Sequence, residues 1–204
     1  MIGCSRSPND FADPFYRHFE LDICDEMAVQ KMFAEIRNDY QGLDILINNA
    51  GVASMNHALV TPTKTVARIM NTNVAGTFLM CREAAKAMMQ GKSGRIINFA
   101  TVATPLKLDG EAIYAASKAA VISLTQILAS EFGPFGITVN AVGPTPVRTD
   151  LIAAVPESKL QKLLQRQALP RFGEFADVSN VIDFFIRPES GFITGQTIFL
   201  GGVS

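Results

Sequence analysis

Segments that fit buried strands alternate along the whole chain with segments that fit helices. Short runs typical of strands occupy residues 1–4, 18–21, 43–47, 95–99, 137–142 and 197–200, and helical patterns occupy 25–40, 63–90, 111–132, 156–168 and 177–185. In the first helical segment, Asp25 can cap a helix whose apolar positions recur at helical spacing. This alternation predicts an α/β fold: a doubly wound, mostly parallel sheet in a three-layer arrangement, with helices on both faces.

A sheet of this kind is expected to bind its ligand at one edge. In open parallel sheets, ligands lie outside the carboxyl ends of the strands. Three loops follow predicted strands at that edge, namely residues 48–51, 100–104 and 143–149. We therefore expect the functional site to be built from these three loops.

Length and composition indicate one ordinary globular domain that spans residues 1–204. Hydrophobic residues make up 48% of the chain, and the net charge is -1 without a basic run, so no nucleic-acid partner is expected. No stretch approaches ~18 continuous apolar residues, and the first residues lack the pattern of a signal peptide, so no membrane span is expected. Cys4, Cys24 and Cys81 are odd in number and widely spaced, which fits neither a disulfide framework nor a zinc site and favours a cytoplasmic protein.

The pair formed by Tyr114 and Lys118 is the strongest chemical signal in the chain. The two residues lie four positions apart in the 111–132 helix, so both side chains lie on one helix face. A phenol has a pKa near ~10, and a fixed ammonium group beside it favours the phenolate and lowers that pKa. The pair is therefore suited to moving a proton on and off an alcohol or carbonyl oxygen. Taken alone, the same spacing also fits an ordinary surface pair.

Several further motifs stand in a fixed order around this pair. They are Asn48-Asn49-Ala50-Gly51 after a strand, Asn73-Val74-Ala75-Gly76 in a helix, Gly94-Arg95-Ile96-Ile97-Asn98 leading to Thr101, Tyr114 to Lys118, Val139-Asn140-Ala141-Val142-Gly143-Pro144, and Thr194-Gly195-Gln196 through Gly201-Gly202. In this order the chain resembles the classical short-chain dehydrogenases/reductases, and among them the 3-oxoacyl-acyl-carrier-protein reductase-like branch. The resemblance extends over essentially the whole chain and implies a Rossmann-like domain that uses a nicotinamide cofactor.

The resemblance also implies roles for four catalytic residues. Tyr114 would be the catalytic acid/base, and Lys118 would activate it and bind the nicotinamide ribose. Thr101 stands where the family usually has a serine that hydrogen-bonds the substrate oxygen. Asn73 matches the asparagine that supports a water relay to the lysine. The structural alternatives are that Thr101 only caps a loop and that Asn73 only satisfies backbone groups in a bent helix.

Cofactor-binding residues follow from the same resemblance. Asn49, Ala50 and Gly51 match the segment that lines the adenosine side of the cofactor, Asp22 the acidic residue near the adenine, and Pro144, Val147 and Thr149 the stretch around the nicotinamide. The loop after the first strand carries Arg6, whose charge can pair with a 2′-phosphate, so NADP(H) is the preferred cofactor and NAD(H) the alternative. The plainer readings are a simple turn at 48–51, an Asp22 that caps a turn and an exposed, unpaired Arg6. No metal site is expected.

The start of the chain departs from the family pattern. Family members begin with a strand, a Thr-Gly-x-x-x-Gly-x-Gly turn and a helix, whose backbone amides approach the pyrophosphate. Here residues 1–7 align with the family's second strand and its following loop, so the domain is expected to be N-terminally truncated relative to the family by one βα unit of roughly 30 residues. The absent strand would lie between strands 1–4 and 43–47, and its absence is expected to expose unpaired backbone groups and apolar faces. A shortened product, a gap filled by rearrangement or by a partner chain, and a relative that no longer binds a dinucleotide are three competing explanations.

The expected function is hydride transfer between NADP(H) and a carbonyl or secondary alcohol, with a 3-oxoacyl thioester on carrier protein as the first substrate candidate. The alternative is a non-catalytic relative that acts as a binding or oligomer subunit. The resemblance further implies a homotetramer or dimer and a substrate lid at residues 151–171 that orders on binding. Thr145 replaces a glycine of the family, which predicts a stiffer or displaced loop beside the nicotinamide. The methyl group of Thr101 is expected to make bulky ketones fit less well.

Overall fold

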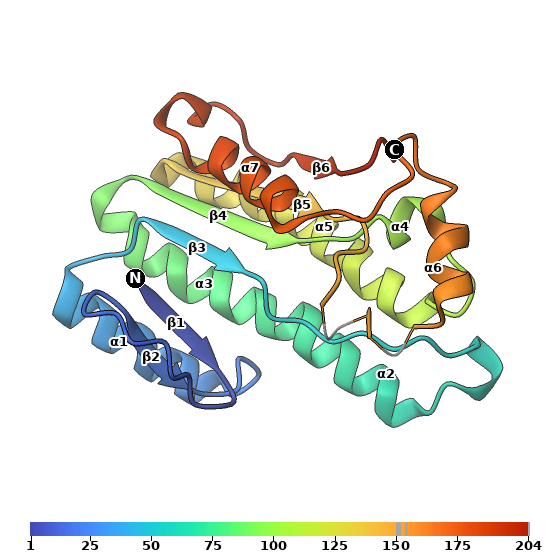
Figure 1. The fold of residues 1–204 in the computed structure, drawn as a ribbon. Coiled ribbons are helices and arrows are strands. Elements are labelled where there is room, and N and C mark those ends of the chain that lie inside the picture. Colours follow the sequence, from blue (N-terminus) through green and yellow to red (C-terminus); the bar gives the residue numbers. More distant parts are fainter. Residues whose placement is uncertain (150–151, 154, 204) are drawn as a thin grey trace.

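The computed structural model describes residues 1–149, 152–153 and 155–203 and has an α/β architecture in which helices flank a parallel sheet (Figure 1). Its strands are β1 (Ile2–Ser5), β2 (Arg17–Glu20), β3 (Ile45–Asn48), β4 (Gly94–Phe99), β5 (Ile137–Gly143) and β6 (Thr197–Phe199). Its α-helices are α1 (Glu26–Tyr40), α2 (Thr63–Met70), α3 (Thr77–Met88), α4 (Ala103–Leu106), α5 (Ala112–Phe132), α6 (Glu157–Leu164) and α7 (Phe175–Ile186). The predicted elements are present with ends shifted by a few residues, and α4 is an addition that the sequence patterns did not indicate.

The main sheet contains four parallel strands in the order β3-β4-β5-β6. Neighbouring residues on β4 face opposite sides, so Ile96 packs in the core on the α3 and α5 side, whereas Ile97 packs with α7. Every residue of β5 is buried, as expected for a central parallel strand covered on both faces. The sheet therefore forms the middle layer between two helical layers, which confirms the predicted fold class.

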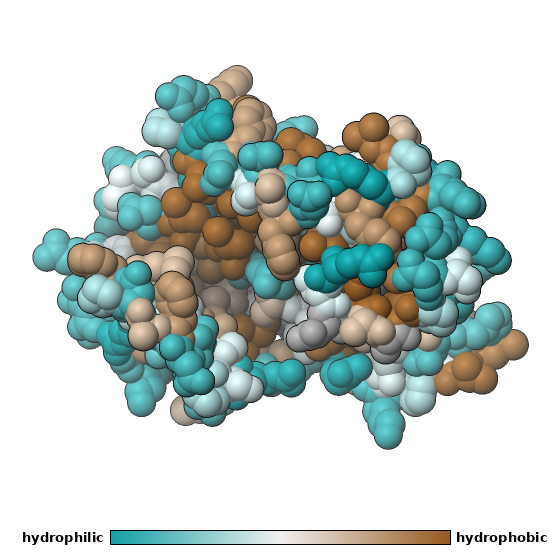
Figure 2. All heavy atoms as spheres, viewed as in Figure 1, coloured by the Kyte–Doolittle hydropathy of each residue, from teal (hydrophilic) through white to brown (hydrophobic). Residues whose placement is uncertain are grey.

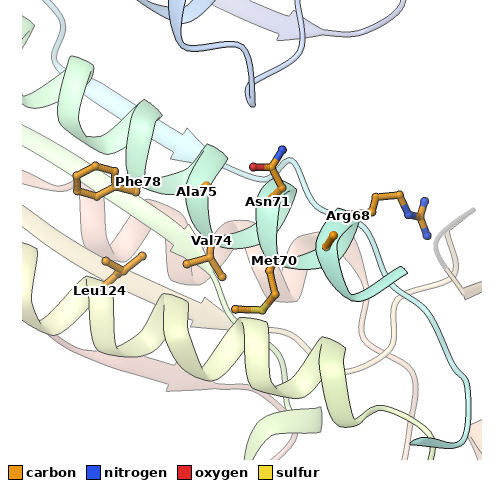
Figure 3. A pocket seen from close by; sticks show the side chains of 8 residues that line it. Arg68, Met70, Asn71, Val74, Ala75, Phe78 and Leu124 are labelled. Carbon is orange, nitrogen blue, oxygen red and sulfur yellow. The ribbon is translucent and has the colours of Figure 1, made fainter. Parts of the chain in front are cut away.

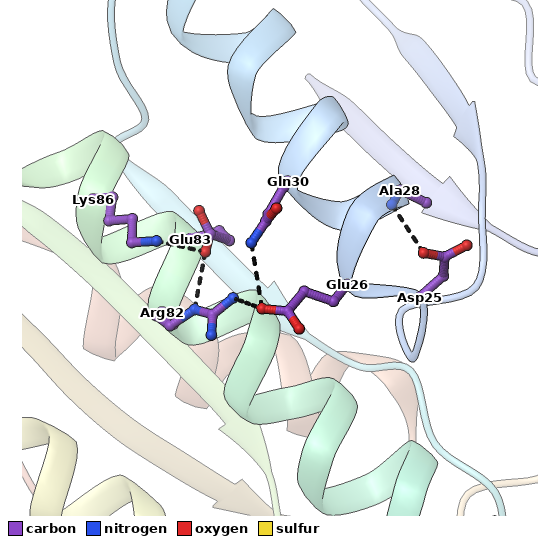
Figure 4. A network of polar contacts seen from close by, with 7 residues as sticks. All are labelled: Asp25, Glu26, Ala28, Gln30, Arg82, Glu83 and Lys86. Atoms are coloured by element: carbon purple, nitrogen blue, oxygen red, sulfur yellow. Dashed lines mark hydrogen bonds and ion pairs between the residues drawn. The ribbon is translucent and has the colours of Figure 1, made fainter.

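Helix α1 is attached to α3 by a network of polar side chains (Figure 4). Asp25 caps α1 by accepting a hydrogen bond from the backbone N–H of Ala28 at 3.1 Å, as the sequence predicts. Arg82 on α3 bridges Glu26 at 2.7 Å and Glu83 at 2.9 Å. Burial would raise the pKa of Glu83, but hydrogen bonds from Lys86 and Arg82 outweigh it and lower that pKa. The network therefore holds α1 against α3 and has a structural role.

Strands β1 and β2 form a separate parallel pair that is not hydrogen-bonded to β3. Both sheets nevertheless contribute to one hydrophobic core with α1 and α3, in which Ile2 and Leu46 take part. On the opposite face of β3, Ile45 and Ile47 are 39% and 45% exposed, although Ile97 beside Ile47 is fully buried under α7. Apolar side chains gather in a hollow on this side of the molecule (Figure 2). The expected exposure of apolar faces is therefore found on one face of β3 only, because the other face is buried against α1 and α3.

The crossover from β1 to β2 contains no helix and uses aromatic side chains instead. Phe11 packs edge-on against Tyr16, with ring centroids 5.3 Å apart. The Tyr16 ring lies so close to Gly3 that a β-carbon at that position would lie 2.2 Å from the phenol oxygen. The Tyr16 hydroxyl also bonds His18 Nδ1 at 2.9 Å. These contacts give His18 a structural role in closing the short crossover.

Helix α5 is unusually apolar. Together with the turn to Phe135 it is long and apolar enough to cross a membrane by length and composition alone, which the search for continuous apolar runs missed. In the fold, however, α5 packs against β4 and β5 and buries Thr125, whose hydroxyl accepts a hydrogen bond from Asn98 at 3.0 Å. Its apolar character is accounted for by a buried face against the sheet and an exposed face that includes Ile127.

Candidate active site

A cavity of about 1410 Å³ opens along the carboxyl ends of β3, β4 and β5. Its walls come from the three loops that the sheet rule selects, from the first turns of α5, and from α6 and α7. Ligand pockets usually measure roughly 300–1,000 Å³. This cavity therefore has room for a dinucleotide and a second molecule together.

Thr101, Tyr114 and Lys118 all line this cavity. Thr101 follows β4, and the other two residues lie one turn apart on α5. Burial raises the pKa of Tyr114 to about 12, a hydrogen bond with Thr101 acts in the opposite direction, and the charge of Glu111 adds to the rise. The predicted lowering of the phenol pKa by the neighbouring ammonium group is thus wrong for this state of the protein. The phenol is protonated at neutral pH and is a proton donor.

The ammonium group of Lys118 is hydrogen-bonded to the backbone. Its Nζ donates a hydrogen bond to the backbone carbonyl of Phe99 at 2.7 Å, at the end of β4. Burial lowers the pKa of Lys118 to about 8. The backbone of Gly51 passes close by, since a β-carbon there would lie 3.5 Å from Lys118 Nζ. The lysine is therefore fixed between the turn after β3 and the end of β4.

Asn73 connects the same turn to α5. It lies fully buried in the π-helical segment Asn71–Gly76 that joins α2 to α3. Its Oδ1 accepts a hydrogen bond from the Val52 N–H at 2.8 Å, and its Nδ2 donates to the Val52 carbonyl and to Ser117 Oγ, both at 2.9 Å. π-Helical turns inside α-helices are frequent at functional sites. Here the wider turn carries a side chain that connects the loop after β3 to α5.

The hydroxyl of Thr101 has one structural contact in addition to its interaction with Tyr114. Its Oγ1 accepts a hydrogen bond from the Ala103 N–H at 3.2 Å, which is the loop-capping contact considered as the plainer alternative. A threonine hydroxyl can accept and donate at once. The capping contact therefore leaves Thr101 able to donate a hydrogen bond toward the cavity.

The residues predicted to bind the cofactor fall into two groups. Asn49, Gly51, Pro144, Val147 and Thr149 line the cavity. Ala50, Arg6 and Asp22 are exposed and are not among its lining residues. The break in the sheet separates the last two from the cavity, because they follow β1 and β2 rather than β3.

Asp22 has the turn-closing contact that was the plainer alternative. Its carboxylate accepts a hydrogen bond from the Cys24 N–H at 2.9 Å. That bond is the main cause of a lowered pKa of Asp22, and the positive charge of Arg6 contributes to the lowering. Arg6 therefore lies near enough to Asp22 for their charges to interact at the ends of β1 and β2.

Sequence reasoning missed Glu111, and it missed the contacts of Thr145, although it had noted that residue as a departure from the family. Glu111, directly before α5, lines the cavity, and burial raises its pKa while the charge of Lys159 opposes the rise. Thr145 is buried, donates a hydrogen bond to Gln167, and packs its methyl group where a side chain on Gly173 would lie. Thr145 thus fixes the loop beside β5 through contacts at long sequence separation, which no local pattern indicates.

The predicted lid at 151–171 contains more structure than a loop. Residues 151 and 154 lie outside the described residues, but α6 is a regular helix within this segment. Leu160 and Leu164 are buried, and Leu163 packs with Val102 and Leu106. This part of the segment is a helix packed against the body of the protein, and the role of residues 151–171 as a substrate lid stays a prediction.

Within the part of the chain that the structure describes, no group of three or more His, Cys, Asp or Glu side chains could hold a metal ion. The three cysteines are not paired in disulfides.

Comparisons with known proteins give one consistent family. A family model described as enoyl-(acyl carrier protein) reductase matches residues 8–203. A 3-oxoacyl-[acyl-carrier-protein] reductase of Staphylococcus aureus (strain Mu50) is 33% identical over 183 residues, which covers 90% of this chain and 74% of the relative. The enzyme of the same description from Aquifex aeolicus gives the same identity and coverage, and that of Vibrio cholerae is 31% identical over 89% of this chain and 75% of the relative.

Solved structures agree with these relatives. The structure of ElxO with NADP bound has a TM-score of 0.82 to this chain and 29% sequence identity. The match covers 91% of this chain and 76% of that chain. The arrangement of elements is therefore similar over most of this chain.

Proposed function

The chain belongs to the short-chain dehydrogenase/reductase family and resembles its 3-oxoacyl-acyl-carrier-protein reductases, and we propose that it is an NADP(H)-dependent oxidoreductase acting on a carbonyl group. The observation that carries the proposal is that Thr101, Tyr114 and Lys118 line one cavity at the carboxyl ends of the strands. The alternative of a non-catalytic subunit gains no support from the bacterial relatives, which are all named as reductases.

The residues around the cavity suit a nicotinamide cofactor. Lys118 Nζ lies beside the backbone of Gly51, where the absence of a side chain leaves space for a ribose. Pro144, Val147 and Thr149 provide a second wall beyond β5. When bound, NADPH supplies the hydride, which is the chemistry that the protein itself cannot perform.

In this proposal, residues of the chain donate the proton and bind the carbonyl oxygen. Thr101 donates a hydrogen bond to the substrate oxygen, and Tyr114 donates its phenolic proton to that oxygen as negative charge develops on it. The raised pKa of Tyr114 keeps the phenol protonated at neutral pH, which favours the direction of reduction. Asn73 holds the turn after β3 and the first turns of α5 in register, so that Lys118 and Tyr114 keep their positions.

The preference for NADP(H) rests on Arg6. It follows β1, the strand whose end would approach the adenosine ribose, and its guanidinium can pair with a 2′-phosphate. ElxO, the structural neighbour, has NADP bound. Since the cavity at β3 does not include Arg6, the cofactor would extend across the break between the two sheets.

A 3-oxoacyl thioester is the proposed substrate. The bacterial relatives are named for reduction of 3-oxoacyl groups on acyl carrier protein. Beside Tyr114, the cavity wall includes apolar side chains from several elements, namely Leu108, Ile152, Val155, Leu160 and Leu163. Such a wall fits an acyl chain.

A homo-oligomer is proposed from an apolar groove that α5 forms with α2, the π-helical segment Asn71–Gly76 and the start of α3 (Figure 3). Phe78 and Leu124 line it from opposite sides, and Phe78 and Met70 are 39% and 37% exposed. Ile127, one turn further along α5, is 54% exposed. Exposed apolar side chains on two neighbouring helices are typical of a helix-to-helix interface, and we infer that a second copy of the chain covers them.

The proposed activity is tested by following NADPH oxidation with the acetoacetyl thioester of N-acetylcysteamine. The parent protein is expected to turn over, and Tyr114→Phe is expected to lower kcat by about 10²-fold or more, because the proton donor is removed. Tyr40→Phe is the matched control, since Tyr40 is 54% exposed and lies outside the cavity. Equal rates for parent and Tyr114→Phe would reject the proposed mechanism.

A further inference from the structure

One wall of the cavity carries cations that the proposed chemistry does not use. Lys159, Lys162 and Arg166 line the cavity from α6 and the turn after it. Their spacing of three and four residues places them on one side of the helix. The backbone N–H of Arg166 bonds the carbonyl of Leu163 at 3.0 Å, so the turn continues the helical path.

These cations stand beside an apolar surface. Leu160 and Leu163 line the same cavity from the same helix, and Leu163 packs against Val102 and Leu106. The helix is therefore anchored by its leucines, while the charged ends of the longer side chains lie in solvent at the mouth of the cavity. An apolar wall with a positive rim is complementary to a ligand that has an apolar part and an anionic group.

The charges on this rim are only partly balanced. Lys159 is near enough to Glu111, which lines the same cavity, for its charge to oppose the rise that burial causes in the pKa of that carboxyl. Lys162 and Arg166 form no ion pair within 4.0 Å with any residue that the structure describes. They are therefore the two cations of the rim best placed to meet a charge from outside.

We propose that Lys162 and Arg166, assisted by Lys159, bind an anionic group of the substrate, so that the enzyme prefers acyl thioesters whose thiol arm carries a phosphate. This inference rests on the proposed function. It assigns specificity to α6, whereas the reacting carbonyl is held by Thr101 and Tyr114. The phosphate would lie at the cavity mouth and the acyl chain against the leucines, which leaves the carbonyl near the phenol.

The test compares two thioesters that share the same reacting ketone. Acetoacetyl-coenzyme A carries phosphates on its thiol arm, and acetoacetyl-N-acetylcysteamine carries none. The double variant Lys162→Gln/Arg166→Gln is expected to raise KM for the coenzyme A thioester about 3- to 10-fold, the range for two exposed ion pairs, with little change in kcat. The neutral thioester should show unchanged kinetics, and the difference should shrink at high ionic strength.

The matched control is Lys31→Gln/Lys64→Gln, which makes the same change in net charge at exposed positions outside the cavity. Equal losses with both thioesters would overturn the proposal, because they would show that the cations serve NADPH or the fold instead. Unchanged kinetics with both would overturn it as well.

A binding measurement separates this proposal from the proposed function. If the parent reduces neither thioester, the proposed activity is wrong, but the affinity for acetoacetyl-coenzyme A can still be measured by isothermal titration calorimetry. The double variant is then expected to bind it about 3- to 10-fold more weakly than the parent does. Equal affinity of the two proteins would reject the anion site.

Discussion

Asn73 Oδ1 accepts a hydrogen bond from the Val52 backbone N–H at 2.8 Å, and this contact joins the π-helical turn after α2 to the loop after β3. The same side chain donates to Ser117, directly before Lys118 on α5. One buried amide group therefore fixes the position of the cofactor turn relative to the catalytic helix. The arrangement of the active site depends on this fixed position of the loop and the helix.

Replacing Asn73 should cost both stability and activity. Asn73→Ala leaves the Val52 N–H and carbonyl without their partner, so we expect a loss of about 3 kcal/mol in the free energy of unfolding, measured by urea denaturation. Asn71→Ala, two residues away and exposed, is the control and should change it by less than about 0.5 kcal/mol. Similar losses for the two variants would contradict the role assigned to the buried amide.

The pH dependence of catalysis should reflect the protonation of Lys118. Its pKa is lowered to about 8 in the folded protein, so the ammonium form predominates below that pH and is lost above it. In the ribose-binding role implied for Lys118 the protonated ammonium group donates the hydrogen bonds, so kcat/KM for NADPH is expected to be level below about pH 7.5 and to fall as the pH rises through 8. The phenol of Tyr114, with a pKa of about 12, stays protonated over this range.

The variant Lys118→Arg keeps the charge at all accessible pH values. Whatever its rate at neutral pH, its profile should lack the fall near pH 8. A parent profile that stays level up to pH 10, or an arginine variant with the same fall, would show that another group controls the rate.

Two substitutions of Thr101 separate the effect of its hydroxyl group on catalysis from that of its methyl group. Thr101→Val keeps the shape and removes the donor, so kcat for ketone reduction is expected to fall about 10²-fold. Thr101→Ser keeps the donor and removes the methyl, and it should retain activity and improve kcat/KM for bulky ketones. Kinetics of Thr101→Ser identical to those of the parent with large and small ketones would argue against a steric role for the methyl.

The groove that α5 forms with α2, the π-helical segment and the start of α3 predicts the assembly state. We expect the parent to have the mass of a dimer or tetramer by light scattering coupled to size-exclusion chromatography. Phe78→Asp places a charge among the apolar side chains of the groove and should shift the mass toward that of the monomer. Phe15→Asp is the control, because Phe15 is 83% exposed in the β1–β2 crossover. A monomeric parent would contradict the proposed interface.

The sequence predicted the sheet and the edge that carries the site because both depend on local patterns and on one general rule. Alternating apolar segments located the strands and helices within a few residues. The rule for parallel sheets then selected the loops that carry Gly51, Thr101 and Pro144, and all three line the cavity.

The parts that the sequence did not predict depend on contacts between distant residues. The hydrogen bond from Lys118 to the Phe99 carbonyl depends on where the end of β4 lies relative to α5. The spacing of Tyr114 and Lys118 alone therefore could not show that the ammonium group binds the backbone. The contact of Thr145 with Gln167, and the position of the α6 cations at the cavity, also depend on how distant segments pack together. The alternation of strand and helix patterns also could not show that the crossover from β1 to β2 has no helix and is packed by Tyr16 and Phe11.

The most direct test of the central claim follows the hydride itself. The protein is incubated with an acetoacetyl thioester and NADPH that carries deuterium at both C4 positions, and the product is analysed by mass spectrometry. Hydride transfer from NADPH to the ketone gives a 3-hydroxybutyryl product with one deuterium on the carbon that bears the new hydroxyl, and this is the expected result. A product without deuterium, or no product from a folded protein that binds NADPH, would contradict it.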